Sequence, residues 1–467
     1  MTDESAYWTI AEAAAKMRRG KVSPVELAKS ALARIEKLNP RLNVFITVTA
    51  ERALRDARAA EREMRRGKFH GLLHGIPITL KDNIWTKGVR TTAGSKFLRD
   101  FVPMADAAVA KKVADAGAVL LGKTNMHEFA YGIITENPHY GPARNPWDTE
   151  RIPGGSSGGS AAALAAGIGF ASVGTDTGGS IRIPAALCGV VGLKPTFGLV
   201  SCNGIVPLAV TLDHAGPLAR TVTDAAIMLD AICEREMAAQ SFYRESGVRR
   251  KKKGGAKLWL GWPRQYFFER VDEEVKSALE KAAKQFEELG ARVEEVLLPH
   301  IEDSVEPSTQ IALAEALEYH ESQGYYPAHA NEYGEDVRKR LEMGSAVRAV
   351  DYLKAQQMRE RVREDFRKAF ERVDAILTPA APIAAPRIGQ ASVDIGGQTE
   401  SVRGALVRMN RPANFTGFPV ISLSCGFTRG GLPIGMALHG AEWSEAKLLC
   451  IALAYEQATE WHLRHAE

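Results

Sequence analysis

The chain has 467 residues, of which 45% are apolar and 25% charged, a composition typical of a globular protein with a large core. Its formal net charge of +4 is small for this length and gives no support for nucleic-acid binding. Five cysteines without a C-x-x-C pair, and a start with neither a basic nor an apolar leader, favour a cytoplasmic protein over a secreted or membrane-bound one.

Helices and strands are expected to alternate along the first half of the chain. The helix at 23–35 carries serine at its cap, proline at its first position and glutamate in its first turn. The other helices expected here lie at 9–17, 107–116, 160–166 and 223–233. Strands are expected at 75–83, 119–122, 170–173, 190–194 and 199–201.

A polar segment at 238–257 marks a boundary, and its basic run at 249–253 is interpreted as a solvated loop. Beyond it, helices are expected at 272–289, throughout 335–372 and at 444–461. Strands are expected at 257–263, 290–296, 373–379, 420–425 and 432–439. The proline-rich segment 379–386 predicts a rigid loop, and all of 379–404 is expected on the surface.

The alternation of strands with helices predicts an α/β fold. The strands near 119, 170, 190, 376 and 420 are apolar throughout, which suits burial on both faces of a sheet. We therefore expect a large, mixed, twisted sheet covered by helices on both faces.

Two glycine-serine clusters, G-G-S-S-G-G-S at 154–160 and T-D-T-G-G-S at 175–180, are the candidates for chemistry. Neither fits the Walker A or the dinucleotide-binding motif. The first matches the G-x-S-x-G nucleophile elbow, but the prolines before it make a poor strand, which that motif requires. An S-x-x-K match at 444–447 lacks a K-T-G partner. No H-E-x-x-H motif occurs, and ligand spacing is absent from His127, His139, His214 and His300, so no metal site is predicted.

The second cluster suits a serine nucleophile. Ser180 follows two glycines, whose backbone freedom lets successive N–H groups point at one oxyanion. A lysine can serve as its base if burial lowers the lysine pKa from about 10.4 to about 7, a shift of about 4–5 kcal/mol. Lys81 ends an apolar strand and has the position for this role. Taken alone, however, Lys81 is better interpreted as an ordinary solvated residue at the end of a strand than as a base.

Together the two clusters resemble the signature of the amidase signature family, with matching stretches at 154–166 and 174–196. The resemblance spans most of the chain and is weakest between 236 and 400. Its other matching blocks lie at 75–83, 122–130, 145–148, 212–226, 412–419 and 431–440.

The resemblance implies a Ser-cisSer-Lys triad, with Ser180 as nucleophile, Ser156 as proton shuttle after a cis peptide bond, and Lys81 as base. It also implies substrate contacts at Ala130 and Ser156, and no cofactor. The implied oxyanion hole consists of four backbone N–H groups, those of Thr177, Gly178, Gly179 and Ser180. Three neighbouring side chains are interpreted as scaffold, namely Ser157, Asp176 and Arg182.

The implied activity is that of a hydrolase acting on linear amides, releasing an acid and ammonia or an amine. The glutamine-hydrolysing subunit of a tRNA-dependent amidotransferase is an alternative. Three departures from the pattern of those subunits disfavour it: Ile183 stands where they are expected to carry glutamine, F-G-L-V-S-C-N-G at 197–204 replaces their usual Y-G-R-V-S-R-Y-G, and the acidic residue expected just before Pro412 is lacking. A catalytically silent binding protein is an alternative of another class, but all three triad residues are present.

The expected partner is a small-molecule amide, with no nucleic acid and no membrane, and the family suggests a homodimer. One domain is expected over 1–467. Its signature core covers about 70–235, and the C-terminal half, 257–467, completes the sheet and the substrate pocket. The motifs do not choose among aliphatic, aryl and indoleacetamide-type amides.

Overall fold

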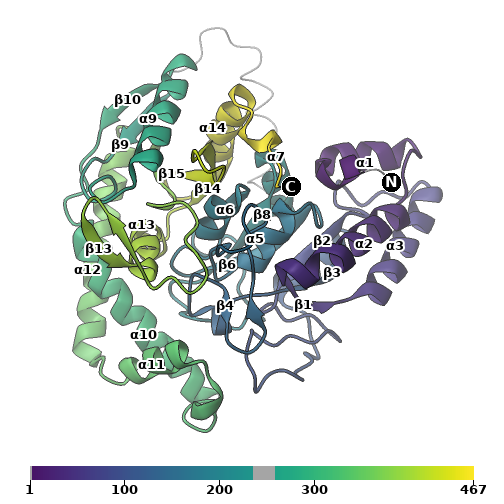
Figure 1. The fold of residues 1–467 in the computed structure, drawn as a ribbon, viewed down its shortest axis with the longest axis horizontal. Helices are drawn as coiled ribbons and strands as arrows, with labels where there is room; N and C mark the ends of the chain where they lie inside the picture. Colours follow the sequence, from purple (N-terminus) through teal and green to yellow (C-terminus); the bar gives the residue numbers. More distant parts are fainter. Residues whose placement is uncertain (1–2, 235–257, 467) are drawn as a thin grey trace.

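The computed structural model describes residues 3–234 and 258–466. The boundary segment 238–257, with its basic run, lies outside the described residues. Helices α1, α2 and α3 (Ile10–Arg18, Pro24–Leu42 and Ala50–Arg65) lie at one end of the molecule, and α9 (Glu273–Glu288) lies at the other (Figure 1). No helix among the described residues combines the length and apolar character needed to cross a membrane.

A mixed sheet of eleven strands forms the centre of the fold, in the order β1-β3-β2-β6-β8-β7-β14-β15-β11-β9-β10. Its strands are β1 Phe45–Val48, β2 Pro77–Lys81, β3 Val119–Thr124, β6 Ala171–Asp176, β7 Val191–Lys194, β8 His214–Ala219, β9 Trp259–Trp262, β10 Arg292–Glu295, β11 Ala375–Pro379, β14 Val420–Phe427 and β15 Pro433–His439. Two small hairpins accompany the sheet, β4–β5 (Glu136–Asn137 and Gly141–Pro142) and β12–β13 (Ser392–Ile395 and Gln398–Ser401).

Helices cover both faces of this sheet, as predicted. Successive strand residues point to opposite faces. On β3, Leu120 packs into a core cluster with α4 and α7, whereas Val119 and Leu121 pack into another with α2 and α5. The remaining helices are α4 Ala108–Asp115, α5 Gly158–Ala165, α6 Arg182–Cys188, α7 Val222–Ile232, α10 Val305–Ser322, α11 Glu335–Gly344, α12 Ala349–Phe370, α13 Val402–Thr416 and α14 Glu445–Ala458.

The predicted start of the second helix is confirmed. Ser23 Oγ accepts the N–H of Glu26, and the Glu26 carboxylate accepts the N–H of Ser23, so the two residues form a capping box. Such reciprocal bonds satisfy N–H groups that have no partner inside the helix. Local sequence therefore fixes this helix start.

Three local predictions are wrong. Residues 199–201 form no strand; Leu199 and Val200 reach the core from a turn. The helix expected over 335–372 is interrupted at 345–348, after Gly344 packs so closely on α10 that an added Cβ would lie 2.6 Å from Leu313 O. Of the segment expected on the surface, 379–386 is mostly buried, because its alanines pack against α13, whereas most of 387–401, including the β12–β13 hairpin, is exposed.

Candidate active site

The sheet brings the two glycine-serine clusters and Lys81 to one edge. β2 pairs in parallel with its neighbour β6, with Leu80 opposite Val173, so the carboxyl ends of both strands meet. Lys81 is the last residue of β2, and the turn 177–180 follows β6 directly. The other cluster enters the same edge just before α5 begins at Gly158.

Lys81 is fully buried and bonded to hydroxyl groups. Its Nζ lies 2.7 Å from Ser156 Oγ and 2.7 Å from Thr175 Oγ1. Burial lowers the pKa of Lys81 to about 7, although the carboxylates of Asp176 and Asp213 act in the opposite direction. The solvated strand end is thereby excluded, and Lys81 can take up and release a proton near neutral pH.

Ser156 is fully buried and follows a cis peptide bond, Gly155–Ser156, as the resemblance predicts. Its carbonyl accepts the N–H of His127 at 3.3 Å. A Cβ added at Gly155 would lie 2.5 Å from Thr135 Oγ1, so only glycine leaves room for this approach. Close packing thus holds the Ser156 hydroxyl against Lys81.

The turn before Ser180 leaves three backbone N–H groups without a hydrogen bond among the described residues, those of Thr177, Gly178 and Ser180. The fourth, Gly179, donates to Asp176 Oδ1 at 2.8 Å. Ser180 Oγ makes no hydrogen bond to the described residues, so the last link from Ser156 to Ser180 is open. Catalytic hydrogen bonds often close only when substrate binds. The two clusters are joined through the Ser157 N–H, which donates to the Ser180 carbonyl at 3.1 Å.

Asp176 and Arg182 hold the turn in place. Arg182 Nε and Nη2 donate to the two carboxylate oxygens of Asp176 at 3.0 and 2.9 Å. Asn414, on α13, donates to Asp176 Oδ1 at 2.9 Å and accepts from Arg182 Nη2 at 2.7 Å. Burial alone would raise the pKa of Asp176, but Arg182 and Asn414 hold it well below its usual range. The interpretation of Asp176 and Arg182 as scaffold fits these contacts, and sequence reasoning missed Asn414.

We expect Arg182→Met to lower the free energy of unfolding by about 3–5 kcal/mol, because it leaves the Asp176 carboxylate buried and unpaired. Urea denaturation measures this loss. The control is Arg99→Met, which removes an exposed arginine paired with Asp100 and should cost less than about 1 kcal/mol. A loss below about 1 kcal/mol in Arg182→Met would show that the pair does not hold the turn.

Ala130 lies in a short turn with left-handed backbone, at φ of 57°. It is almost fully buried, and its N–H donates to the carbonyl of His127 at 3.0 Å. The next side chain, Tyr131, carries a buried hydroxyl that has no hydrogen-bond partner among the described residues. A contact between Ala130 and substrate stays a prediction.

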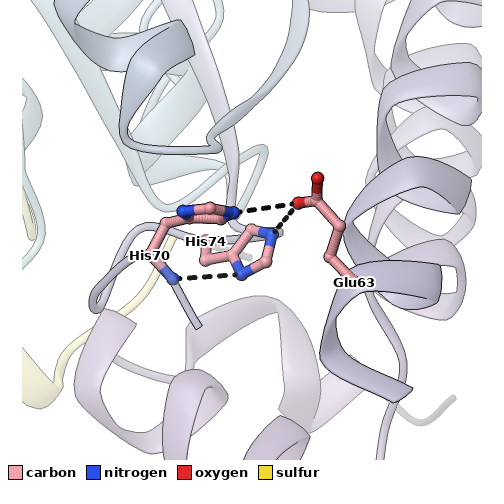
Figure 2. Close-up of side chains that lie close together, drawn as sticks. All are labelled: Glu63, His70 and His74. Carbon is pink, nitrogen blue, oxygen red and sulfur yellow. Dashed lines mark hydrogen bonds and ion pairs between the residues drawn. The ribbon is translucent and has the colours of Figure 1, made fainter. Parts of the chain in front are cut away.

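One group of side chains among the described residues has the spacing of metal ligands, namely Glu63, His70 and His74 (Figure 2). Both imidazole Nε2 atoms lie 3.1 Å from Glu63 Oε2, and the His70 N–H donates to His74 Nδ1 at 3.4 Å. Because His74 Nδ1 accepts that bond, its Nε2 carries a proton and points it at the carboxylate. The three side chains form a hydrogen-bonded group at the start of β2, at the other end of the strand from Lys81.

The sequence profile of the Amidase family matches residues 26–449. A glutamyl-tRNA(Gln) amidotransferase subunit from Geotalea daltonii is 43% identical, with 98% of each chain covered. A crystal structure of an amidase superposes with a TM-score of 0.88 at 36% identity, covering 96% of this chain and 99% of that one. The corresponding amidotransferase subunit from Thermotoga maritima superposes with a TM-score of 0.79 at 35% identity, covering 98% and 96%.

These likenesses correct one expectation. The sequence alone predicted a small-molecule amide as partner and no nucleic acid. The Geotalea relative is by name one subunit of an amidotransferase for glutamyl-tRNA(Gln), so a partner set without nucleic acid is contradicted.

Proposed function

The chain belongs to the amidase signature family, and on this premise we propose that it hydrolyses a carboxylic amide through an acyl-enzyme on Ser180. The observation that carries the proposal is the 2.7 Å contact between buried Lys81 and Ser156, at the strand edge from which the Ser180 turn emerges. Acyl transfer needs a base, a relay hydroxyl and a nucleophile, and this edge of the sheet carries a candidate for each.

In the proposed mechanism, neutral Lys81 accepts a proton from Ser156 as Ser156 accepts one from Ser180. Ser180 Oγ attacks the amide carbon. The N–H groups of Thr177, Gly178 and Ser180 donate to the oxyanion. Gly179, the fourth residue assigned to the hole, would contribute only if its N–H left Asp176. The proton returns through Ser156 to the leaving nitrogen, and water then attacks the acyl-enzyme and releases the acid.

Glutamine is the first candidate for the amide, within a tRNA-dependent amidotransferase. The relative that supports it matches almost the whole chain at 43% identity. In that role the released ammonia is passed on to glutamyl-tRNA(Gln), and the chain works with partner subunits.

A different small amide is the second candidate. It is supported by the better superposition on the amidase than on the amidotransferase subunit of similar identity. Ile183, which stands where the amidotransferase subunits are expected to carry glutamine, also supports this second candidate. This apolar side chain is fully buried, and Cβ atoms added at Gly154 and Gly179 would lie 3.2 and 2.7 Å from it, so it fills the space between the two clusters.

The test is release of ammonia or amine from a panel of amides that includes glutamine, with Ser180→Ala as control. The chain is assayed alone, and again with the other amidotransferase subunits and glutamyl-tRNA(Gln). Turnover of glutamine that rises with the partners supports the first candidate, and turnover of another amide by the chain alone supports the second. If no amide is cleaved and a fluorophosphonate fails to label Ser180, the chain is a silent binding protein.

The pH dependence follows from the lysine. With a pKa of about 7, the neutral fraction of Lys81 is about 10% at pH 6 and about 90% at pH 8. Because only the neutral amine accepts a proton, kcat/KM should rise about tenfold over that interval and then level off. A rate that stays constant between pH 5.5 and 8 would contradict the assignment of Lys81 as base.

A further inference from the structure

Three arginines gather beside the turn that carries Ser180. Arg411 and Arg403 lie on α13, which packs against α6 and α10, and Arg340 lies on α11. The Arg340 guanidinium lies 5.4 Å from the centre of the ring of Tyr131, the residue after Ala130. Burial raises the pKa of the Tyr131 hydroxyl, and the positive charges of all three arginines oppose that rise. The cluster formed by these three arginines and Tyr131 is called the arginine cluster below.

Arg411 connects the cluster to the candidate active site. A Cβ added at Gly178 would lie 3.4 Å from Arg411 Nε and 3.6 Å from its Nη2, so the guanidinium lies against the proposed oxyanion turn. Arg411 Nη1 donates to Thr309 Oγ1 at 2.7 Å, whereas Nε is buried without a hydrogen bond. No carboxylate among the described residues forms an ion pair with Arg411.

Arg403 and Tyr131 repeat this pattern. Within the described part of the chain, Arg403 Nε and the Tyr131 hydroxyl are both buried without a hydrogen-bond partner, and Arg403 has no ion pair. Burial lowers the pKa of Arg403, and the like charges of Arg340 and Arg411 lower it further, which is the direction expected of crowded cations. At neutral pH a guanidinium nevertheless keeps its charge.

Of the three arginines, only Arg340 has an acidic partner within residues 3–234 and 258–466. Its Nη2 lies 3.0 Å from Asp336 Oδ2, and its Nη1 donates to the Tyr131 carbonyl. The same Asp336 oxygen lies 2.9 Å from His127 Nε2. The Asp336 carboxylate is therefore shared between Arg340 and His127, and it forms no ion pair with Arg403 or Arg411 among the described residues.

A buried donor without a partner costs about 1–3 kcal/mol, and more when it is charged. Arg411 and Arg403 each carry such a donor, and the Tyr131 hydroxyl is a third, so the arginine cluster is well suited to an anionic ligand. Guanidinium groups bind carboxylates with parallel N–H···O bonds, which makes a carboxylate the chemistry that best matches the cluster.

We propose that Arg411, Arg403 and Tyr131 bind a carboxylate on the acyl part of the amide, so that the substrate is an anionic amide of a dicarboxylic acid. The proposal rests on the hydrolysis proposed above. It specifies the substrate class for the second candidate, a small amide other than glutamine. Asp336, the carboxylate that faces the cluster, is occupied by Arg340 and His127. Among the described residues no acid is thus left there to receive an ammonium group, and the substrate carries none beside its carboxylate.

The test compares amides that differ in one group. Malonamate, succinamate and glutaramate are paired with propionamide, butyramide and valeramide, in which a methyl group replaces the carboxylate. At the best chain length, kcat/KM of the acidic amide should exceed that of its neutral pair at least 100-fold. Glutaramate should also exceed glutamine, which differs from it only by the α-amino group.

Variants of the arginine cluster show which side chains cause the preference for acidic amides. Arg411→Met and Arg403→Met should each reduce the ratio of acidic to neutral kcat/KM at least tenfold, and Tyr131→Phe about threefold or more. The matched control is Arg338→Met, which removes an arginine of α11 that pairs with Glu342, and it should leave the ratio unchanged.

A binding measurement on the wild-type chain tests the inference even if the variants fold poorly. In the wild-type chain, glutarate or succinate should slow fluorophosphonate labelling of Ser180 at concentrations where valerate does not. Equal turnover of acidic and neutral amides, or a preference for glutamine over glutaramate, would overturn the inference and leave the proposed hydrolysis standing. Loss of turnover with every amide, together with no labelling of Ser180, would overturn both.

Discussion

Ser180→Ala is expected to lower kcat for the best amide by about 10⁴-fold or more, since removal of a nucleophile leaves only the contribution of binding and the oxyanion hole. The fold should survive, because Ser180 Oγ makes no hydrogen bond to the described residues. The measurement is steady-state turnover, together with the urea midpoint of the same preparation. An unchanged midpoint with turnover lost would assign the effect to chemistry.

Ser157→Ala is the matched control. This neighbouring serine is equally buried, but its Oγ donates to the Thr175 carbonyl at 3.1 Å and has no place in the proposed proton path. Its loss should cost about 1 kcal/mol of stability and change turnover less than tenfold. If Ser157→Ala lost as much activity as Ser180→Ala, the nucleophile would have to be assigned again.

Lys81→Met should lower kcat/KM by about 10²–10⁴-fold, the contribution typical of a positioned base. Methionine resembles lysine in length and removes only the amine, so Ser156 keeps its packing and loses its proton acceptor. The remaining activity should no longer rise between pH 6 and 8, since the group with a pKa of about 7 is gone. Turnover from pH 5.5 to 9 measures both effects.

Lys123→Met separates base catalysis from the general effect of a buried lysine. Lys123 is also fully buried, and burial lowers its pKa to about 8, but its Nζ contacts Thr91 Oγ1, the Ile84 carbonyl and Asp82. We expect a less stable protein whose rate per folded molecule keeps the wild-type pH profile. A profile that flattens as in Lys81→Met would remove the distinction between the two lysines.

Most strands and the candidate nucleophile Ser180 could be located from the sequence because their signals are local. Apolar runs mark buried strands, glycine pairs mark tight turns, and the cap at Ser23 is complete within four residues. The role of Lys81 depended on the family resemblance, since its burial results from the neighbouring strand and from Ser156, which is distant in the chain. The structure shows directly that Lys81 is buried.

The residues that the C-terminal half of the chain places beside the Ser180 turn could not be predicted in this way. Asn414 bonds to Asp176 across 238 positions of sequence, and Arg411 reaches Gly178 from the same helix. Asn414 lies in the block 412–419 that resembles the amidase signature family, but neither that block nor any periodicity shows which distant residue it contacts. The helix that carries them, α13, includes Pro412, which is typical of a helix end rather than an interior. Helix α10 lies between 236 and 400, where the resemblance is weakest.

The order of the strands bears on how the chain reaches its folded state. β14 and β15, close to the C-terminus, lie in the interior of the sheet between β7 and β11. Until they are synthesised, β7 and β11 present unpaired edges, which are sites of aggregation. Contacts so distant in sequence also form slowly. A ribosome-bound fragment that ends before residue 420 would thus lack the middle of its sheet, and such nascent chains are natural clients of chaperones that shield exposed strands.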